Sequence, residues 1–481
     1  MIRLSVAYVL VRSLSGLFSV TGVFIFTRIM SPATLGAYAV AGALGIFVHS
    51  ALSSWITVCV TRFTPGETRN ARLYAETLRR ILGLVLVCEI AVAVLLAAVR
   101  PFGIPASLPL LVAAIAGGQA TFEFTLTWLN ARQRNVRYAV MALSRPFLFV
   151  SAGLCLWLLR GADNTLAMAL AISFFAAALV GGFNPARLVT AWGAGIEKPL
   201  VKDLLDFGMP MSLTLVLTSV VNQADRVLLT YLGGTWETGV YAVSADLTQQ
   251  VLYFALSAIN SAFLPQIYRS SSSGDEAAAR GWQGRQFEML AAVSLPALVA
   301  FVMLSRNIAH VFMGKQFSAE ATRLLPILAV SVFFAALRTC YFETSFQYAR
   351  KTSWQALIAA SMAIFSVGLN VIAIPRFGAL GAAYVSLVSC GSACALCIVL
   401  GYRFAYPLPY SVAAVARVLA ASAAMAAALF WLRAWSGPIA LGVQVTLGVL
   451  VYGTAAYWLN ICDLGVSTRR WIEAGAVVRA R

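Results

Sequence analysis

Runs of about 20 apolar residues, separated by short polar stretches, recur along the whole chain. A run of this length, coiled as an α-helix, matches the thickness of the hydrocarbon core of a bilayer. Hydrophobic residues make up 60% of the 481 residues and charged residues only 11%, which is too few to cover the surface of a water-soluble protein of this size. The sequence therefore predicts a protein that crosses a membrane many times.

The predicted fold class is an all-α polytopic membrane protein with about 14 transmembrane helices. Helices are expected because the strands of a transmembrane barrel would alternate apolar and polar residues. The first run is long enough to span and is not followed by a signal-peptide cleavage site, so we interpret it as the first span. The expected spans are roughly 4–29, 35–60, 81–99, 108–130, 138–159, 165–183, 204–231, 239–266, 287–305, 322–347, 354–374, 379–401, 411–432 and 438–460.

The positions of lysine and arginine predict the orientation of these spans. If both termini are cytoplasmic, positive residues on the inner side outnumber those on the outer side by roughly three to one, as the positive-inside rule requires. The formal net charge of +17 is then mostly a consequence of topology. No basic stretch is interleaved with stacking aromatic residues, so the charge does not indicate a nucleic-acid partner. Both the N-terminus and the C-terminus are therefore predicted to lie in the cytoplasm.

A short string is written twice, as GAYAV at 36–40 and GVYAV at 239–243. The same offset of 203 residues also aligns polar positions on both flanks, including Ser19 with Asn222 and Ser54 with Ser257. We therefore predict two parallel six-helix copies, related by an axis along the membrane normal, with a substrate site between them. The expected domains are an N-lobe at 1–190, a C-lobe at 191–405, and two further helices with a cytoplasmic tail at 406–481.

Charged residues occur inside the expected spans, where each costs about 2.5–3.5 kcal/mol on insertion scales. The arginines are Arg12, Arg145, Arg226, Arg338 and Arg417, with Arg28 near the outer end of the first span. The acids are Glu89, Glu123, Asp225, Asp246 and Glu343. Internal ion pairs or snorkelling would explain them, and so would a hydrated polar cavity.

The spacing of polar residues favours the cavity. Gln119, Glu123, Thr127 and Asn130 fall on one helical face, and so do Asp246, Gln250, Tyr253, Ser257 and Ser261. The candidate substrate-binding residues are Arg12, Arg28, Arg145, Asn222, Arg226, Tyr253 and Arg338. The candidates for ion coupling are Glu123, Asp225, Asp246 and Glu343. His49 fits a core histidine better than a proton carrier.

Cysteines do not indicate a metal or a disulfide framework. Cys390, Cys394 and Cys397 share one helical face inside an apolar run, without a nearby histidine or acid. We interpret them as small packing residues. No metal site and no cofactor are expected.

Three motifs, in order, carry a family resemblance. They are Arg28-Ile29-Met30-Ser31-Pro32 followed by Gly36-Ala37-Tyr38, Asp225-Arg226-Val227-Leu228-Leu229 followed by Gly239-Val240-Tyr241, and Asn370 to Pro375 followed by Gly378-Ala379-Leu380-Gly381. The chain resembles bacterial polysaccharide flippases of the O-antigen type, which belong to the multidrug/oligosaccharidyl-lipid/polysaccharide exporter (MOP) superfamily. Met30 departs from the leucine that is usual there.

The resemblance implies a flippase of the bacterial cytoplasmic (inner) membrane, which moves a polyprenyl-diphosphate-linked oligosaccharide to the outer leaflet by alternating access. Its partners would be that lipid, the surrounding membrane, a proton or sodium ion, and the polysaccharide polymerase machinery. An alternative is a cation-coupled drug or metabolite exporter of the same fold. A membrane enzyme such as a glycan polymerase is disfavoured, because the outer loops are short and show no recognisable catalytic arrangement. The chain is therefore predicted not to be an enzyme.

Overall fold

Helices coincide with the apolar runs of the sequence, because a helix satisfies its own backbone hydrogen bonds within lipid. The computed structural model describes residues 2–64, 71–99, 107–161, 164–191, 198–349 and 351–463. Among these residues, ten helices are long and apolar enough to cross a membrane, and two shorter apolar helices cover Ser15–Ile29 and Thr165–Val180. All fourteen expected spans lie on helices, so a count of fourteen is compatible with the structure.

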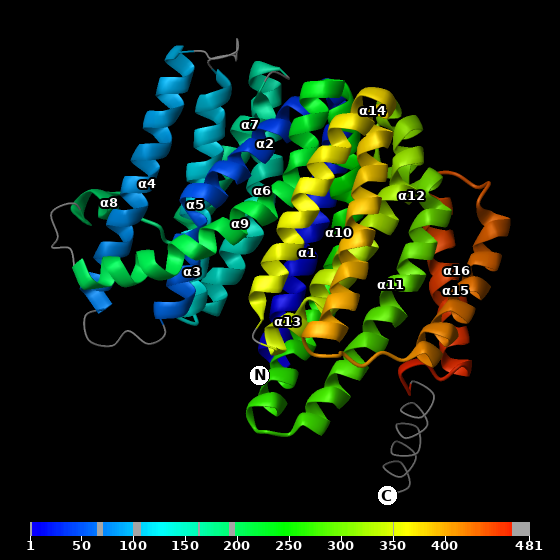
Figure 1. The fold of residues 1–481 in the computed structure, drawn as a ribbon. Coiled ribbons are helices and arrows are strands. Elements are labelled where there is room, and N and C mark those ends of the chain that lie inside the picture. Colours follow the sequence, from blue (N-terminus) through cyan, green and yellow to red (C-terminus); the bar gives the residue numbers. More distant parts are fainter. Residues whose placement is uncertain are drawn as a thin grey trace, which may run out of the picture. The chain divides into compact units, whose positions relative to one another are not determined.

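The long helices are α1 (Ile2–Ile29), α2 (Pro32–Leu52), α4 (Ala71–Val99), α5 (Ser107–Ala131), α6 (Asn135–Arg160), α7 (Thr165–Val180), α9 (Lys198–Gly233), α10 (Thr235–Ser272), α11 (Glu276–Phe312), α12 (Lys315–Leu337), α14 (Thr352–Phe404), α15 (Val412–Leu432) and α16 (Pro438–Trp458) (Figure 1). Shorter pieces are α3 (Ser54–Phe63), α8 (Ala186–Ala191), a π-helix (Arg338–Phe342), α13 (Thr344–Tyr348) and a 3₁₀ turn (Ile461–Asp463). Several helices exceed the roughly 20 residues that a bilayer core needs, notably α10 with 38 residues.

The chain forms two compact units. The first contains Met1–Gly22, Met30–Ala242 and Ala363–Ala379, and the second contains Val23–Ile29, Val243–Met362 and Leu380–Arg481. Helices α1, α10 and α14 each contribute residues to both units.

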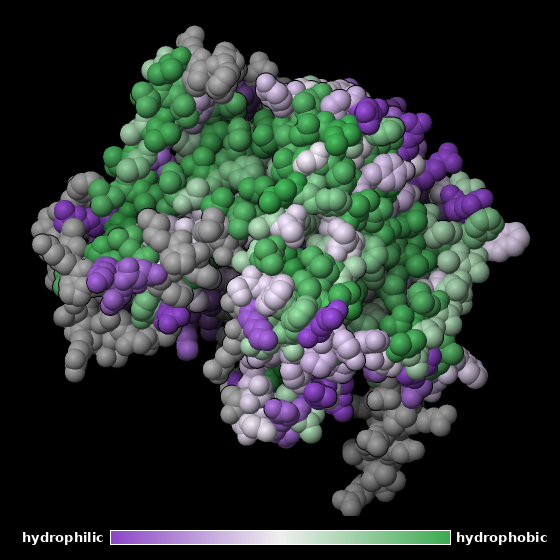
Figure 2. All heavy atoms as spheres, viewed as in Figure 1, coloured by the Kyte–Doolittle hydropathy of each residue, from purple (hydrophilic) through white to green (hydrophobic). Residues whose placement is uncertain are grey.

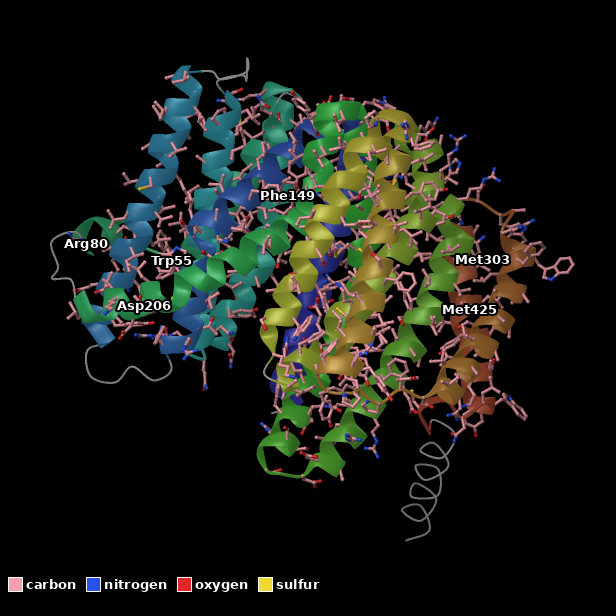
Figure 3. The ribbon with its side chains drawn as sticks, viewed as in Figure 1. Trp55, Arg80, Phe149, Asp206, Met303 and Met425 are labelled. Atoms are coloured by element: carbon pink, nitrogen blue, oxygen red, sulfur yellow. The ribbon has the colours of Figure 1, made fainter. Side chains whose placement is uncertain are left out.

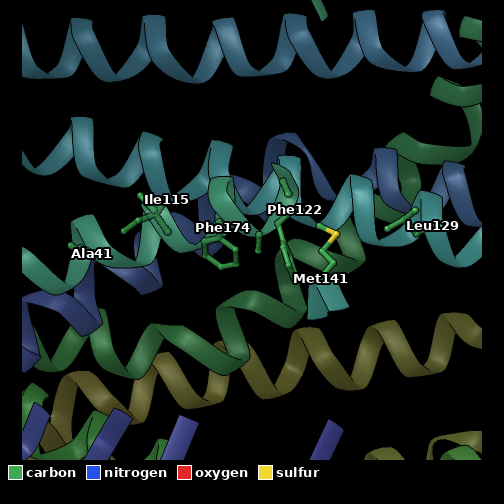
Figure 4. Packing of buried hydrophobic residues seen from close by; sticks show 10 residues of the cluster. Ala41, Ile115, Phe122, Leu129, Met141 and Phe174 are labelled. Carbon is green, nitrogen blue, oxygen red and sulfur yellow. The ribbon is translucent and has the colours of Figure 1, made fainter. Parts of the chain in front are cut away.

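The core of the first unit is built from small and aromatic side chains. Phe122 of α5 and Phe174 of α7 lie with their ring centroids 5.7 Å apart, next to Ile115 and Met141 (Figure 4). A second cluster surrounds Trp55 of α3 (Figure 3). Gly208 of α9 leaves room for this ring, since a Cβ at Gly208 would lie 2.6 Å from it.

The second unit pairs α15 with α16 and packs both against α11. Buried amides join the three helices: Asn307 of α11 donates to Gln444 of α16 at 2.7 Å, and Gln444 donates to the Leu432 carbonyl at the end of α15 at 2.8 Å. Tyr452 of α16 donates to the Ala292 carbonyl of α11 at 2.6 Å. Such bonds hold helices together where lipid offers no hydrophobic driving force.

Apolar side chains also cover the outside of individual helices. On α4, exposed large hydrophobic residues include Leu84, Val87, Ile90, Val94 and Leu95. Figure 2 shows hydrophobic residues over the upper part of α4. In a water-soluble protein this exposure would be costly, whereas acyl chains satisfy it. The protein is a multi-pass membrane protein.

The repeated GxYAV strings lie against each other within the first unit. A Cβ placed on Gly36 would lie 1.8 Å from the Thr235 carbonyl oxygen, and a Cβ on Gly239 would lie 1.8 Å from the Pro32 carbonyl oxygen. With the 203-residue offset, Gly36 corresponds to Gly239 and Pro32 corresponds to Thr235, so the two contacts are equivalent. A two-fold related pair of segments makes contacts of this reciprocal kind. The starts of α2 and α10 therefore cross through two glycines, and larger residues could not replace them without moving the backbone.

Two expected spans are interrupted in ways that the sequence analysis missed. The span predicted at 35–60 breaks at Ser53, between α2 and α3, and the span predicted at 322–347 contains the π-helix Arg338–Phe342. The turn expected between the spans at 354–374 and 379–401 is present: α14 is two helical arms that meet at Gly378, which has φ 56° and ψ −136°. The carboxylate of Glu237 accepts the Ala379 N–H at 2.8 Å and so caps the second arm.

Candidate functional site

A hydrogen-bonded charge cluster joins α2, α4 and α5 in the first unit. The imidazole Nε2 of His49 lies 3.0 Å from a carboxylate oxygen of Glu123, and Gln119 donates to the other oxygen at 2.9 Å. His49 exposes only 3% of its side chain, whereas Glu123 exposes 37%. Gln119 and Glu123 therefore do lie on one face of α5, as predicted. Glu123 also contacts His49 of α2, which was predicted to be a core histidine.

Glu89 of α4 extends this cluster. Ser53, at the break between α2 and α3, donates to Glu89 at 2.7 Å, and His49 also lies near the Glu89 carboxylate. Both Ser53 and Glu89 are buried. In the described part of the structure, His49 Nδ1, Glu89 Oε2 and Gln119 Oε1 are buried without a hydrogen-bond partner. Three such atoms in one cluster leave capacity for further protons or water.

Arg145 of α6 lies on the same side of the first unit as Glu123. Its guanidinium is 4.8 Å from the ring centroid of Phe174 and close enough to the Glu123 carboxylate for their opposite charges to attract, and Tyr38 also lies nearby. Tyr38 is the tyrosine of the first repeated string, and its ring stacks on Phe149 with centroids 5.7 Å apart. The structure thus brings together two predicted site residues, Arg145 and Glu123.

Asp225 of α9, a candidate for ion coupling, also connects α9 to α10. Its carboxylate accepts the hydroxyl of Tyr241, the tyrosine of the second repeated string, and the backbone N–H of Arg226 at 2.9 Å. Arg226 is half-buried, and Asn222, one turn earlier, is exposed. The two repeated tyrosines therefore have different partners, because the position equivalent to Asp225 in the first copy is Gly22.

Arg338 and Glu343 form a buried ion pair in the second unit, at 2.8 Å. Arg338 is the first residue of the π-helix and Glu343 directly follows it. The wider turn of a π-helix brings side chains five residues apart close together, and Gln355 donates to Glu343 at 3.2 Å. The sequence analysis assigned Arg338 to substrate and Glu343 to an ion. In this structure each neutralises the other.

The remaining candidates are spread over the chain. Arg28 is exposed, lies 3.6 Å from the Phe24 ring centroid, and donates to the Val311 carbonyl at 2.7 Å. Tyr253 and Asp246 are half-buried on α10. Arg417 donates to the Asn460 carbonyl at 3.3 Å. The side chain of Arg12 lies outside the described residues.

An arginine-lined pocket lies at one end of the first unit, where the sequence analysis counted charges only as topology. Its volume is about 450 Å³, within the range of ligand sites. Phe124, Trp128, Leu129 and Phe183 supply its apolar lining. Its five arginines are Arg79, Arg132, Arg134, Arg137 and Arg187.

Two helix ends of the same kind hold the walls of this pocket. At the end of α5, Arg134 N–H donates to the Leu129 carbonyl and Gln133, with φ 54°, donates to Asn130, both at 2.9 Å. At the end of α7, Phe183 donates to Ala178 at 3.0 Å and Gly182, with φ 92°, donates to Leu179 at 2.9 Å. Both are Schellman motifs, in which a left-handed residue closes the helix. Two of the five arginines, Arg132 and Arg134, thus lie on a defined turn.

Comparison with known proteins places this geometry in context. A family model described as "Polysaccharide biosynthesis protein" matches residues 130–322. A solved structure of the lipid II flippase MurJ, in an inward closed conformation, superposes with a TM-score of 0.74 at 12% identity, covering 96% of this chain and 99% of that one. The chain shares its fold with this flippase.

Multidrug transporters share this fold with lower TM-scores. The eukaryotic MATE transporter AtDTX14 gives a TM-score of 0.55 at 16% identity, covering 86% of this chain and 97% of the other. An outward-facing MATE family transporter of the MOP superfamily gives 0.51 at 16% identity, covering 84% and 94%. Comparison with curated proteins by sequence gives no match. The resemblance predicted from the three motifs is confirmed, and the fold is one that membrane flippases and transporters use.

Proposed function

We propose that this protein moves a polyprenyl-diphosphate-linked oligosaccharide from the cytoplasmic to the outer leaflet by alternating access, for surface polysaccharide synthesis. One observation carries the proposal: similarity to the lipid II flippase extends over 96% of the chain with a TM-score of 0.74, against 0.55 for AtDTX14. The polysaccharide-biosynthesis family match over residues 130–322 supports the glycan part of the substrate.

Within this proposal, Arg145 is the candidate for contact with the diphosphate in the first unit. It lies among Tyr38, Phe174 and the partly exposed Glu123. Guanidinium groups bind phosphate oxygens through paired N–H donors. Arg338 is a weaker candidate, because Glu343 already satisfies its charge in this structure. Arg12, Arg28, Arg226, Asn222 and Tyr253 stay predictions.

Coupling to an ion is proposed for the His49–Glu123–Glu89 cluster. His49 and Glu123 share a hydrogen bond, and unpaired buried atoms lie beside it. The membrane potential can contribute as well, since moving one charge across it is worth about 2.3 kcal/mol per 100 mV. Asp225, Asp246 and Glu343 stay alternative coupling residues.

Deletion of the gene tests the function in the cell. The expected result is accumulation of the oligosaccharide-lipid on the cytoplasmic leaflet, together with loss of the surface glycan. Complementation with the wild-type chain should restore both. Normal surface glycan combined with new sensitivity to cationic drugs would instead support the exporter alternative.

A further inference from the structure

The five arginines of the pocket at the ends of α5 and α7 place like charges close together. Arg79 lies close enough to Arg187 and Arg132 for their positive charges to repel, and Glu76 is the neighbouring acid that acts on Arg79. None of the described residues that line the pocket is acidic. Repulsion of this kind is relieved when a multivalent anion bridges the guanidiniums.

The positive-inside rule predicts positive charge at cytoplasmic helix ends but does not require those charges to gather around one pocket. Topology would be served equally well by arginines scattered over the surface. Here they converge on one cavity of about 450 Å³ from α4, from the Schellman turn after α5, from α6 and from α8. Four of the five are exposed and Arg79 is half-buried, so their N–H groups are accessible to a ligand.

The base of the pocket is aromatic and therefore suits a headgroup at the edge of the bilayer. The ring of Trp128 stacks on Phe124 at 6.1 Å and on Tyr74 at 6.3 Å, and Arg132 lies 4.4 Å from its centroid. Tryptophan and arginine are typical of the interface between lipid and water. Helix α4 carries Arg79 in the pocket and then a series of exposed apolar side chains that can contact acyl chains.

We infer that this pocket binds the phosphate headgroup of an anionic membrane lipid. Basic pockets between transmembrane helices on the cytoplasmic side bind such headgroups by the same physics. Two lipids have this chemistry: the polyprenyl-diphosphate carrier of the proposed function, and an anionic phospholipid such as cardiolipin. The inference rests on the proposed function only for the first source, because a phospholipid would occupy the site whatever the protein transports.

Native mass spectrometry of the purified full-length protein tests the site. The probes are polyprenyl diphosphate, cardiolipin and neutral diacylglycerol. The variant R132Q/R134Q/R137Q removes three pocket charges, and the matched control R280Q/R285Q/R403Q removes three exposed arginines of the second unit that also lie near aromatic rings. We expect the pocket variant to bind the preferred anionic lipid about tenfold more weakly and the control variant to bind normally.

The outcomes separate the two sources and the two proposals. A preference for polyprenyl diphosphate identifies the pocket as a place where the carrier docks, and equal or stronger binding of cardiolipin identifies a phospholipid site. Equal losses in both variants, or no loss in either, overturn the inference. If the triple variant does not fold, the single variant R187E must show the same loss. Binding is measured without transport, so a failed transport assay leaves this result unaffected.

Discussion

Individual charged side chains in this protein are held by partners that differ from unit to unit. Glu343 neutralises the charge of Arg338. Glu123 instead makes hydrogen bonds with His49 and Gln119, and part of its side chain is exposed. A charge paired inside the membrane contributes to structure, and one that faces an open space can bind a substrate or an ion. Variants of these pairs separate the two roles.

The Arg338–Glu343 pair should behave as a buried ion pair. R338M or E343M alone leaves one charge unpaired, and we expect each to lower the free energy of unfolding by about 3–5 kcal/mol. The double variant R338M/E343M should recover most of that loss. Unfolding in detergent, with transport measured in parallel, checks this. If the double variant is stable but does not transport, the result supports a direct contact between Arg338 and the substrate.

The His49–Glu123 hydrogen bond should contribute to stability as well. H49A removes one partner of a partly buried carboxylate, and we expect a loss of about 1–3 kcal/mol in unfolding free energy. H49Q keeps a side chain that can donate to Glu123 and serves as the control. If H49A and H49Q unfold alike, the bond is not what holds these helices.

At the scale of helices, the crossing of α2 and α10 depends on two small residues. G36A and G239A each place a methyl group 1.8 Å from a carbonyl oxygen of the other helix, so the backbone must move. We expect each to lower the free energy of unfolding by about 1–3 kcal/mol. G42A is the control, because its Cβ would lie 3.7 Å from Leu170, an ordinary contact. Thermal melting in detergent compares the three.

The second arm of α14 depends on a cap from another helix. E237A removes the acceptor for the Ala379 N–H, and we expect a loss of about 1 kcal/mol in unfolding free energy. E320A, which removes an exposed acid 3.5 Å from Arg323, should change stability by less than about 0.5 kcal/mol. Equal effects of the two variants would show that the cap contributes nothing.

Apolar length and charge bias predicted the helices and the turn at Gly378, because both follow from the energetics of lipid. The break at Ser53 was missed because it involves a contact with another helix, in which Ser53 donates to Glu89 of α4. The π-helix was missed because a regular α-helix was assumed, in which Arg338 and Glu343, five residues apart, would not face each other. Spacing grouped Gln119 with Glu123 correctly. It gave no signal that His49 would join them, because His49 is on another helix.

The arginine pocket was missed for a similar reason. Its charges come from several separate segments, and in one dimension they look like ordinary cytoplasmic loop charges. Only the fold brings Arg79 and Arg187 together. The repeated GxYAV strings, in contrast, were visible in the sequence, and the structure gives them a physical reason in the reciprocal contact of Gly36 and Gly239.

For the molecule as a whole, we propose that one polytopic chain moves a diphosphate-linked lipid between leaflets. The fold is shared with the lipid II flippase over nearly its full length, and the same fold also serves multidrug transporters. Fold alone therefore does not decide the substrate.

Reconstitution in vesicles decides it most directly. The purified protein is inserted into vesicles that hold a polyprenyl-diphosphate-linked oligosaccharide with a labelled sugar, and the fraction of label accessible from outside is followed over time. The account predicts exchange between leaflets that requires the protein and is slower with R145Q. If the label stays in its original leaflet, while the same vesicles transport a cationic drug, the central claim is wrong.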